Sequence, residues 1–81
     1  MPKNIITQVE ARKGGITRNY YDSNDIQFKQ ISNNGHGHKR EESLGYHGEH
    51  AHDYIYKDGK LIARPSRELT EQERKENLDI L

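Results

Sequence analysis

Alternation of apolar and polar positions predicts β-strands in the first third of the chain. Residues 5–9 (IITQV) are typical of a strand, and residues 16–21 combine alternation with β-branched and aromatic side chains that favour strands. Residues 13–15, Lys-Gly-Gly, lie between these runs and are typical of a chain reversal. The pattern therefore predicts that the two runs form an antiparallel pair.

A second turn is predicted at residues 22–25, whose acidic, amide and hydroxyl side chains stabilise tight turns. Ile26 and Phe28 then resume the alternation on a returning strand. Ile31 is out of phase with both, so we expect a bulge or a strand end near Gln30. Together these segments predict a hairpin unit over residues 4–31.

The middle of the chain changes from alternating to polar and glycine-rich. Residues 32–49 contain Gly35, Gly37, Gly45 and Gly48 and predict a loop. Alternation returns from residue 50, and Asp58-Gly59 is the strongest hairpin signal in the chain. We therefore predict a second hairpin over residues 50–64.

A helix is predicted over residues 71–81. Thr70 and Glu73 have the spacing of a capping box, in which each side chain accepts a hydrogen bond from the backbone of the other. Leu78, Ile80 and Leu81 place apolar surface in the last turn, which should dock on the sheet. The predicted fold class is α+β, with an antiparallel sheet of about four to five strands in two hairpins and one C-terminal helix.

Composition limits how stable such a fold can be. The 81 residues, of which 30% are hydrophobic and 32% charged, predict a single small domain over residues 1–81 with a modest core. The absence of cysteine excludes disulfides and thiolate zinc sites. Added stability would have to come from a metal ion, a partner or self-association, including a homodimer.

Charge and hydropathy indicate which kinds of partner the protein could bind. No apolar stretch approaches the roughly 20 residues that span a bilayer, so we expect a soluble protein without a membrane partner. The net charge is zero, but residues 1–40 hold seven Lys/Arg against three Asp/Glu, which is +4, and residues 41–81 hold six against ten, which is −4. The basic first part is compatible with a polyanion such as RNA.

The chemistry of the chain is concentrated in five histidines, His36, His38, His47, His50 and His52. On a strand, side chains two positions apart share a face, so His50 and His52 should point the same way. The glycine-rich loop could bring the other three histidines toward them.

Several roles fit such a cluster, and the sequence leaves them open. The imidazoles could bind a transition metal such as zinc, nickel, copper or iron, zinc or nickel being preferred, with a nearby carboxylate such as Glu49 or Asp53 completing or orienting the site. Two histidines could instead act as general base and general acid on a phosphodiester, while Arg or Lys stabilises the charge on phosphate. A switch driven by imidazole protonation and an incidental surface cluster are further interpretations.

The candidate residues follow from these roles. The catalytic candidates are His50, His52, His47, His36 and His38. The candidate metal ligands are His50, His52, His47 and Glu49. The candidate phosphate-binding residues are Arg64, Lys39 and Arg67.

Four segments also resemble known sequences. Residues 16–25 (ITRNYYDSND), 30–38 (QISNNGHGH), 46–54 (YHGEHAHDY) and 67–77 (RELTEQERKEN) resemble a module at the C-terminal ends of phage-associated and polymorphic-toxin-like proteins of Gram-positive bacteria. The resemblance implies an effector domain, frequently a nuclease, delivered within a larger bacterial or phage protein and paired with an immunity protein. It carries over no catalytic residue, and a cytoplasmic location is the alternative.

The sequence thus favours a small toxin-like nuclease that cleaves RNA by histidine acid/base or metal-assisted chemistry. The rival hypothesis is a non-enzymatic, phage-associated module for metal binding or protein interaction, with a structural ion in the histidine cluster.

Overall fold

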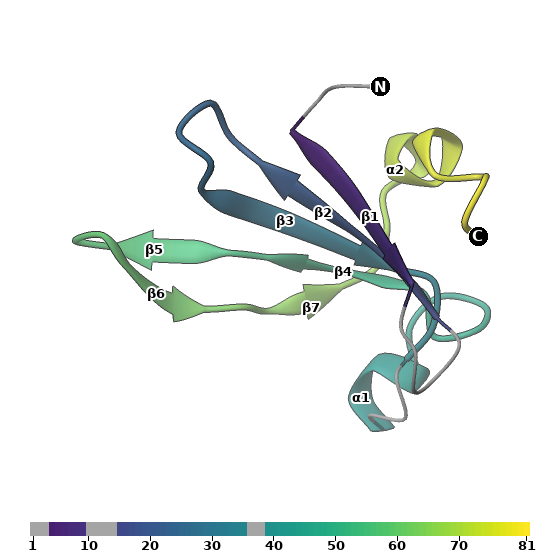
Figure 1. Ribbon diagram of the computed structural model, residues 1–81. Coiled ribbons are helices and arrows are strands. Elements are labelled where there is room, and N and C mark those ends of the chain that lie inside the picture. The colour runs from purple at the N-terminus through teal and green to yellow at the C-terminus, as the bar shows by residue number, and fades with distance from the viewer. Residues whose placement is uncertain (1–3, 10–14, 36–38) are drawn as a thin grey trace.

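Five antiparallel strands form the main sheet, in the order β1, β2, β3, β4, β7 (Figure 1). The computed structural model describes residues 4–9, 15–35 and 39–81. The strands of this sheet are β1 (Ile5–Val9), β2 (Ile16–Tyr21), β3 (Gln27–Ser32), β4 (His50–Asp53) and β7 (Ser66–Arg67). A separate two-stranded sheet pairs β5 (Ile55–Lys57) with β6 (Lys60–Ala63), and the helices are α1 (Lys39–Glu42) and α2 (Glu71–Glu76). The α+β class predicted from the sequence is confirmed.

Turn residues set the hairpins where the sequence predicts them. Asp22 Oδ1 accepts hydrogen bonds from the backbone N–H of Asn24 at 2.8 Å and of Ile26 at 3.1 Å, which closes the β2–β3 turn. Asp58 and Gly59 have φ of 52° and 78°, the two positive values that a tight hairpin turn requires. The residues of the earlier predicted turn, Lys13 and Gly14, lie outside the described residues.

The bulge expected near Gln30 is present, two residues earlier on the same strand. Tyr20 pairs with Lys29 and Tyr21 pairs with Gln27, so Phe28 is an extra residue on β3. Ile31 is fully buried in the core, whereas Phe28 is exposed and its ring centroid lies 6.2 Å from that of Tyr20. The phase change in the apolar pattern between Phe28 and Ile31 reflects this extra residue.

The second hairpin differs from the prediction in its extent. Strand β4 pairs with β3 and with β7, so the pairing continues beyond residue 64 to Ser66–Arg67. The two outer strands β5 and β6 form their own small sheet, which extends away from the main sheet (Figure 1). Within the predicted loop 32–49, Ser32 belongs to β3 and residues 39–42 form α1, a single helical turn.

The predicted helix over 71–81 is too long. The capping box of Thr70 and Glu73 is present and α2 begins at Glu71, but it ends at Glu76. Asn77 leaves helical geometry because its side chain is buried, where Nδ2 donates to the Glu73 carbonyl at 2.8 Å and Oδ1 accepts from Arg18 at 2.9 Å. This turn directs Ile80 into the core, whereas Leu78 and Leu81 remain exposed.

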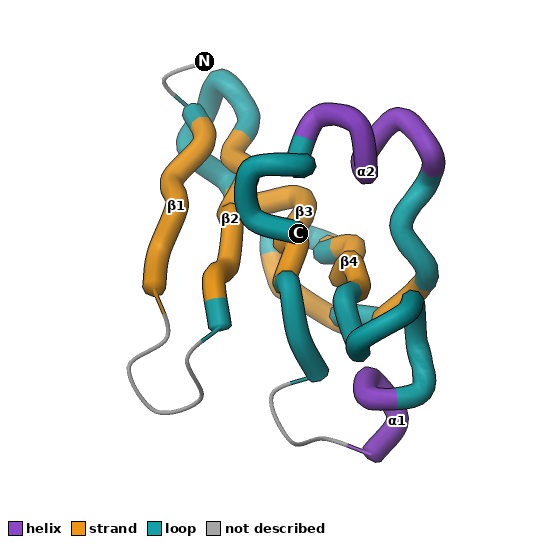
Figure 2. Tube along the Cα trace, turned by 90° about the vertical axis from the view of Figure 1, so that its right-hand side faces the viewer, coloured by secondary structure: helices purple, strands orange, loops and turns teal. Residues whose placement is uncertain are grey.

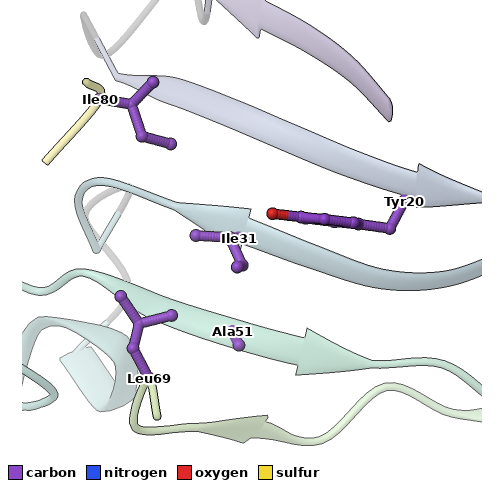
Figure 3. Close-up of a cluster of buried hydrophobic side chains, with 5 residues drawn as sticks. All are labelled: Tyr20, Ile31, Ala51, Leu69 and Ile80. Carbon is purple, nitrogen blue, oxygen red and sulfur yellow. The ribbon is translucent and has the colours of Figure 1, made fainter. Parts of the chain in front are cut away.

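A small core lies between one face of the sheet and α2 with its flanking segments (Figures 2 and 3). It consists of Tyr20, Ile31, Ala51, Leu69 and Ile80. Arg18 on the same face is 3% exposed and is held by Asn77 and Asp79. No helix in the described part of the chain has the length and hydropathy to cross a membrane.

The opposite face of the sheet is polar. By register, one cross-strand row contains Asn19, Gln30, His52 and Ser66. The neighbouring row contains Thr17, Ser32 and His50, which are 1%, 0% and 0% exposed. Buried polar side chains cost free energy unless they are hydrogen-bonded or hold a ligand. This second, polar interior is therefore the candidate functional region.

Candidate functional site

Strand β4 places His50 and His52 together on the polar face, as their spacing predicts. His50 lies opposite Ser32, and His52 lies opposite Gln30 on one side and Ser66 on the other. The two imidazole rings are nearly perpendicular, at 88°, with centroids 4.8 Å apart. His50 is fully buried, whereas His52 is partly exposed and forms the accessible side of the pair.

Backbone carbonyls fix the orientation of both rings. His50 Nδ1 lies 2.8 Å from the Gly48 carbonyl oxygen, and His52 Nδ1 lies 3.1 Å from the Arg64 carbonyl oxygen. A carbonyl oxygen only accepts hydrogen bonds, so both Nδ1 atoms must carry the hydrogen. Gly48, at φ 85°, adopts the left-handed conformation that lets its carbonyl reach back to the ring.

The same anchoring turns the two Nε2 atoms toward each other, 3.2 Å apart. With both Nδ1 atoms protonated, a hydrogen bond between the Nε2 atoms requires that one ring be an imidazolium cation. A buried cation is costly, and burial together with the charges of His50 and Arg64 lowers the pKa of His52 below 6.5, against the raising effect of its bond to the Arg64 carbonyl. Two neutral rings in this arrangement would instead direct both Nε2 lone pairs at one point.

An acidic residue of α1 completes the surroundings of the pair. Burial disfavours ionisation of Glu41, but its own backbone amide, the nearby His50 and His52 and a hydrogen bond with Ser66 outweigh it and lower its pKa. A negative charge thus lies within electrostatic reach of both rings. Ser32 Oγ is buried beside His50 and has no hydrogen-bond partner among the described residues.

Arg64 lies at the accessible side of the site. Its backbone carbonyl orients His52, and its guanidinium carbon lies 4.9 Å from the centroid of the Tyr54 ring. Its Nη2 is 3.5 Å from Gln30 Oε1, at the limit of hydrogen bonding. Of the three predicted phosphate-binding residues, Arg64 is the one placed beside the histidine pair.

Of the other two predicted phosphate-binding residues, Arg67 is not placed there. Arg67 lies on the core face, where its guanidinium is bound to Asp53 at 2.7 Å and to Glu73 at 2.8 Å. These carboxylates raise the pKa of Arg67 and occupy its hydrogen-bond donors. Lys39 is an exposed residue of α1. Arg67 is thus a structural residue in this fold.

Glu49 anchors a loop rather than facing the histidines. Its Oε1 accepts from the backbone N–H of Tyr46 at 3.0 Å and from that of His47, and its Oε2 accepts from Arg74 at 2.8 Å. Burial opposes its ionisation, but these donors lower the pKa of Glu49 to about 2. Because its oxygens are engaged, Glu49 does not complete a metal site here, and His47 is exposed on the same loop.

His36 and His38 lie outside the described residues. Within residues 4–9, 15–35 and 39–81, no three His, Asp or Glu side chains are arranged to hold a metal ion, so the described site offers two nitrogen ligands. Sequence reasoning missed Glu41 and Ser66. No pattern marks α1 as a helix, and the two-residue strand that carries Ser66 is too short to leave a signal.

No protein-family model, curated protein or solved structure matches this chain.

Proposed function

We propose that this domain binds one divalent transition-metal ion, zinc or nickel, through Nε2 of His50 and Nε2 of His52. The observation that carries the proposal is the 3.2 Å separation of these atoms combined with the donation of both Nδ1–H groups to carbonyl oxygens. Two Zn–N bonds of about 2.05 Å at a tetrahedral angle place their nitrogens about 3.3 Å apart. The pair therefore has the separation that a shared metal ion requires.

The anchoring of the rings supports the same conclusion. Histidine ligands of metal ions usually donate their second ring N–H to a carbonyl or carboxylate, which fixes the ring and increases the basicity of the ligating nitrogen. Both His50 and His52 do so. Glu41 would offset part of the positive charge of the ion from a position near both rings.

Metal-free acid/base catalysis by this pair has less support. A general base and a general acid must lie on opposite sides of the reacting phosphate, each at hydrogen-bond distance, so their nitrogens should be more than about 6 Å apart. The observed separation is 3.2 Å, and His50 is fully buried. The pair is therefore better suited to hold an ion than to enclose a phosphate.

The metal would stabilise the fold because it binds the folded chain. An ion present at 100 times its dissociation constant adds about 2.7 kcal/mol. For a domain of this size that corresponds to a rise in Tm of roughly 10 to 20 °C. Two protein ligands leave coordination positions for water or substrate, and catalytic zinc sites likewise keep an open position.

The test is metal analysis and metal titration of untagged protein. We expect about one zinc or nickel ion per chain, and at least a tenfold loss of affinity in His52→Gln. The matched control is His47→Gln, because His47 is exposed and the hydrogen bonds that orient the pair do not involve its ring. His52→Gln with wild-type affinity, or wild-type protein that binds neither metal, would refute the proposal. Circular dichroism of each variant checks that the fold is retained.

A further inference from the structure

Arg64 differs from the other arginines whose side chains the structure describes. Three of them form ion pairs with carboxylates, namely Arg18 with Asp79, Arg67 with Asp53 and Glu73, and Arg74 with Glu49. Arg64 forms no ion pair with another described residue, and it is exposed. Its charge is therefore available to an anion from solution.

The position of Arg64 limits where such an anion can bind. The guanidinium carbon lies 4.9 Å from the centroid of the Tyr54 ring, a cation–π contact that requires none of the N–H donors of the group. The backbone of the same residue holds His52, so the cation and the accessible histidine belong to one short segment of the fold. An anion bound by Arg64 would therefore lie at the segment that also orients His52.

We propose that Arg64 and the metal ion together bind a phosphodiester group of single-stranded RNA and promote its cleavage. This inference rests on the proposed metal site. A guanidinium binds two phosphate oxygens through parallel hydrogen bonds, and a metal ion with open positions binds a further oxygen and stabilises the charge that develops on it.

RNA suits this site because its 2′-hydroxyl supplies the nucleophile within the substrate. The 2′-oxygen forms a bond to phosphorus while the bond from phosphorus to the 5′-oxygen breaks. The proton of the 2′-hydroxyl passes to solvent, and the departing 5′-oxygen takes a proton from solvent. The products are a 2′,3′-cyclic phosphate and a 5′-hydroxyl, with no net gain or loss of atoms or electrons.

The experiment uses the full chain loaded with zinc or nickel and a labelled single-stranded RNA oligonucleotide. We expect cleavage that stops with chelator and yields cyclic phosphate ends. Arg64→Gln should reduce the rate at least tenfold and leave metal affinity within twofold of wild type, because the carbonyl that orients His52 is retained. Arg64→Lys should cleave the RNA at a rate between those of wild type and Arg64→Gln. Lys60→Gln, which removes an exposed cation of β6, is the matched control and should behave as wild type.

A binding measurement separates recognition from cleavage. A 2′-O-methyl RNA cannot be cleaved by this route, and fluorescence anisotropy should show that Arg64→Gln binds it more weakly, with a smaller dependence on salt. If wild type and Arg64→Gln bind the 2′-O-methyl RNA equally and cleave RNA equally, the inference about Arg64 is refuted, but the proposed metal site is not. Absence of both activities in metal-loaded protein, or equal cleavage of DNA, would also refute it. Failure of wild-type protein to bind metal would instead remove the proposed function itself.

Discussion

Glu73 offers a sharp test of the electrostatics that hold α2 on the sheet. Its carboxylate is buried, with Oε1 accepting from Arg67 at 2.8 Å and from the Thr70 backbone N–H at 2.9 Å, and with Oε2 3.0 Å from Lys29 Nζ. These donors, Arg67 first, outweigh burial and lower the pKa of Glu73 from 4.5 to about 2. We expect Glu73→Gln to remove this favourable ionisation.

The size of the effect follows from the pKa difference. A fall from 4.5 to about 2 corresponds to roughly 3 kcal/mol. Allowing for partial screening of Arg67 by solvent, we expect about 2 to 3 kcal/mol. Because the pKa is lowered in the folded state, this stability is complete above about pH 5 and is lost as the pH falls toward 2.

The assay is urea unfolding followed by far-ultraviolet circular dichroism, since the chain has no tryptophan. Wild type should exceed Glu73→Gln by about 2 to 3 kcal/mol at pH 7, and the gap should close as the pH approaches 2. Glu71→Gln, at an exposed position of the same helix, controls for loss of a helix-terminal charge and should change stability by less than about 0.5 kcal/mol. A gap that stays constant between pH 5 and 2 would show that the Glu73 carboxylate is not stabilised as described.

Two predictions concern backbone geometry. Gly48→Ala should lower the free energy of unfolding by more than about 2 kcal/mol, because φ at this position is 85° and a Cβ there would lie 2.7 Å from the Gly35 nitrogen. Gly59→Ala should cost about 1 kcal/mol, because φ is 78° but a Cβ at this position would meet open space. Thermal melts compare the two, and equal losses would contradict the steric argument. Thr70→Ala should cost about 1 kcal/mol by removing the helix cap, as measured by urea unfolding; an unchanged midpoint would contradict it.

Local chemistry explains which parts of the fold could be predicted. The Asp58-Gly59 turn and the capping box of Thr70 and Glu73 depend on residues within four positions of one another, and both form as their spacing indicates. The end of α2 could not be predicted from such local spacing. Asn77 stops the helix because its side chain binds Arg18, 59 positions away in the sequence. Distant partners of this kind leave no local pattern.

The candidate site likewise contains some residues whose positions the sequence predicted and others whose positions it did not. Strand alternation was enough to place His50 and His52 on one face. Arg64, Lys39 and Arg67 were indistinguishable in sequence, since each is a cation near a turn or strand end. Pairing of β7 with β4 turns the side chain of Arg67 toward the core face and the carboxylate of Glu73, whereas Arg64 lies beside the histidine pair.

The sequence by itself determined the α+β class, the turns at residues 22–25 and 58–59, the start of the C-terminal helix and the shared face of the two histidines, because each follows from short-range geometry. Only the tertiary structure decided that the Nε2 atoms of those histidines face each other at 3.2 Å, since the carbonyls that orient the rings come from Gly48 and Arg64 on different segments. It also decided that Glu41 lies near the pair and that Glu49 is bound elsewhere. The physical reason is that hydrogen-bond direction depends on which backbones meet, and a linear pattern does not contain that information.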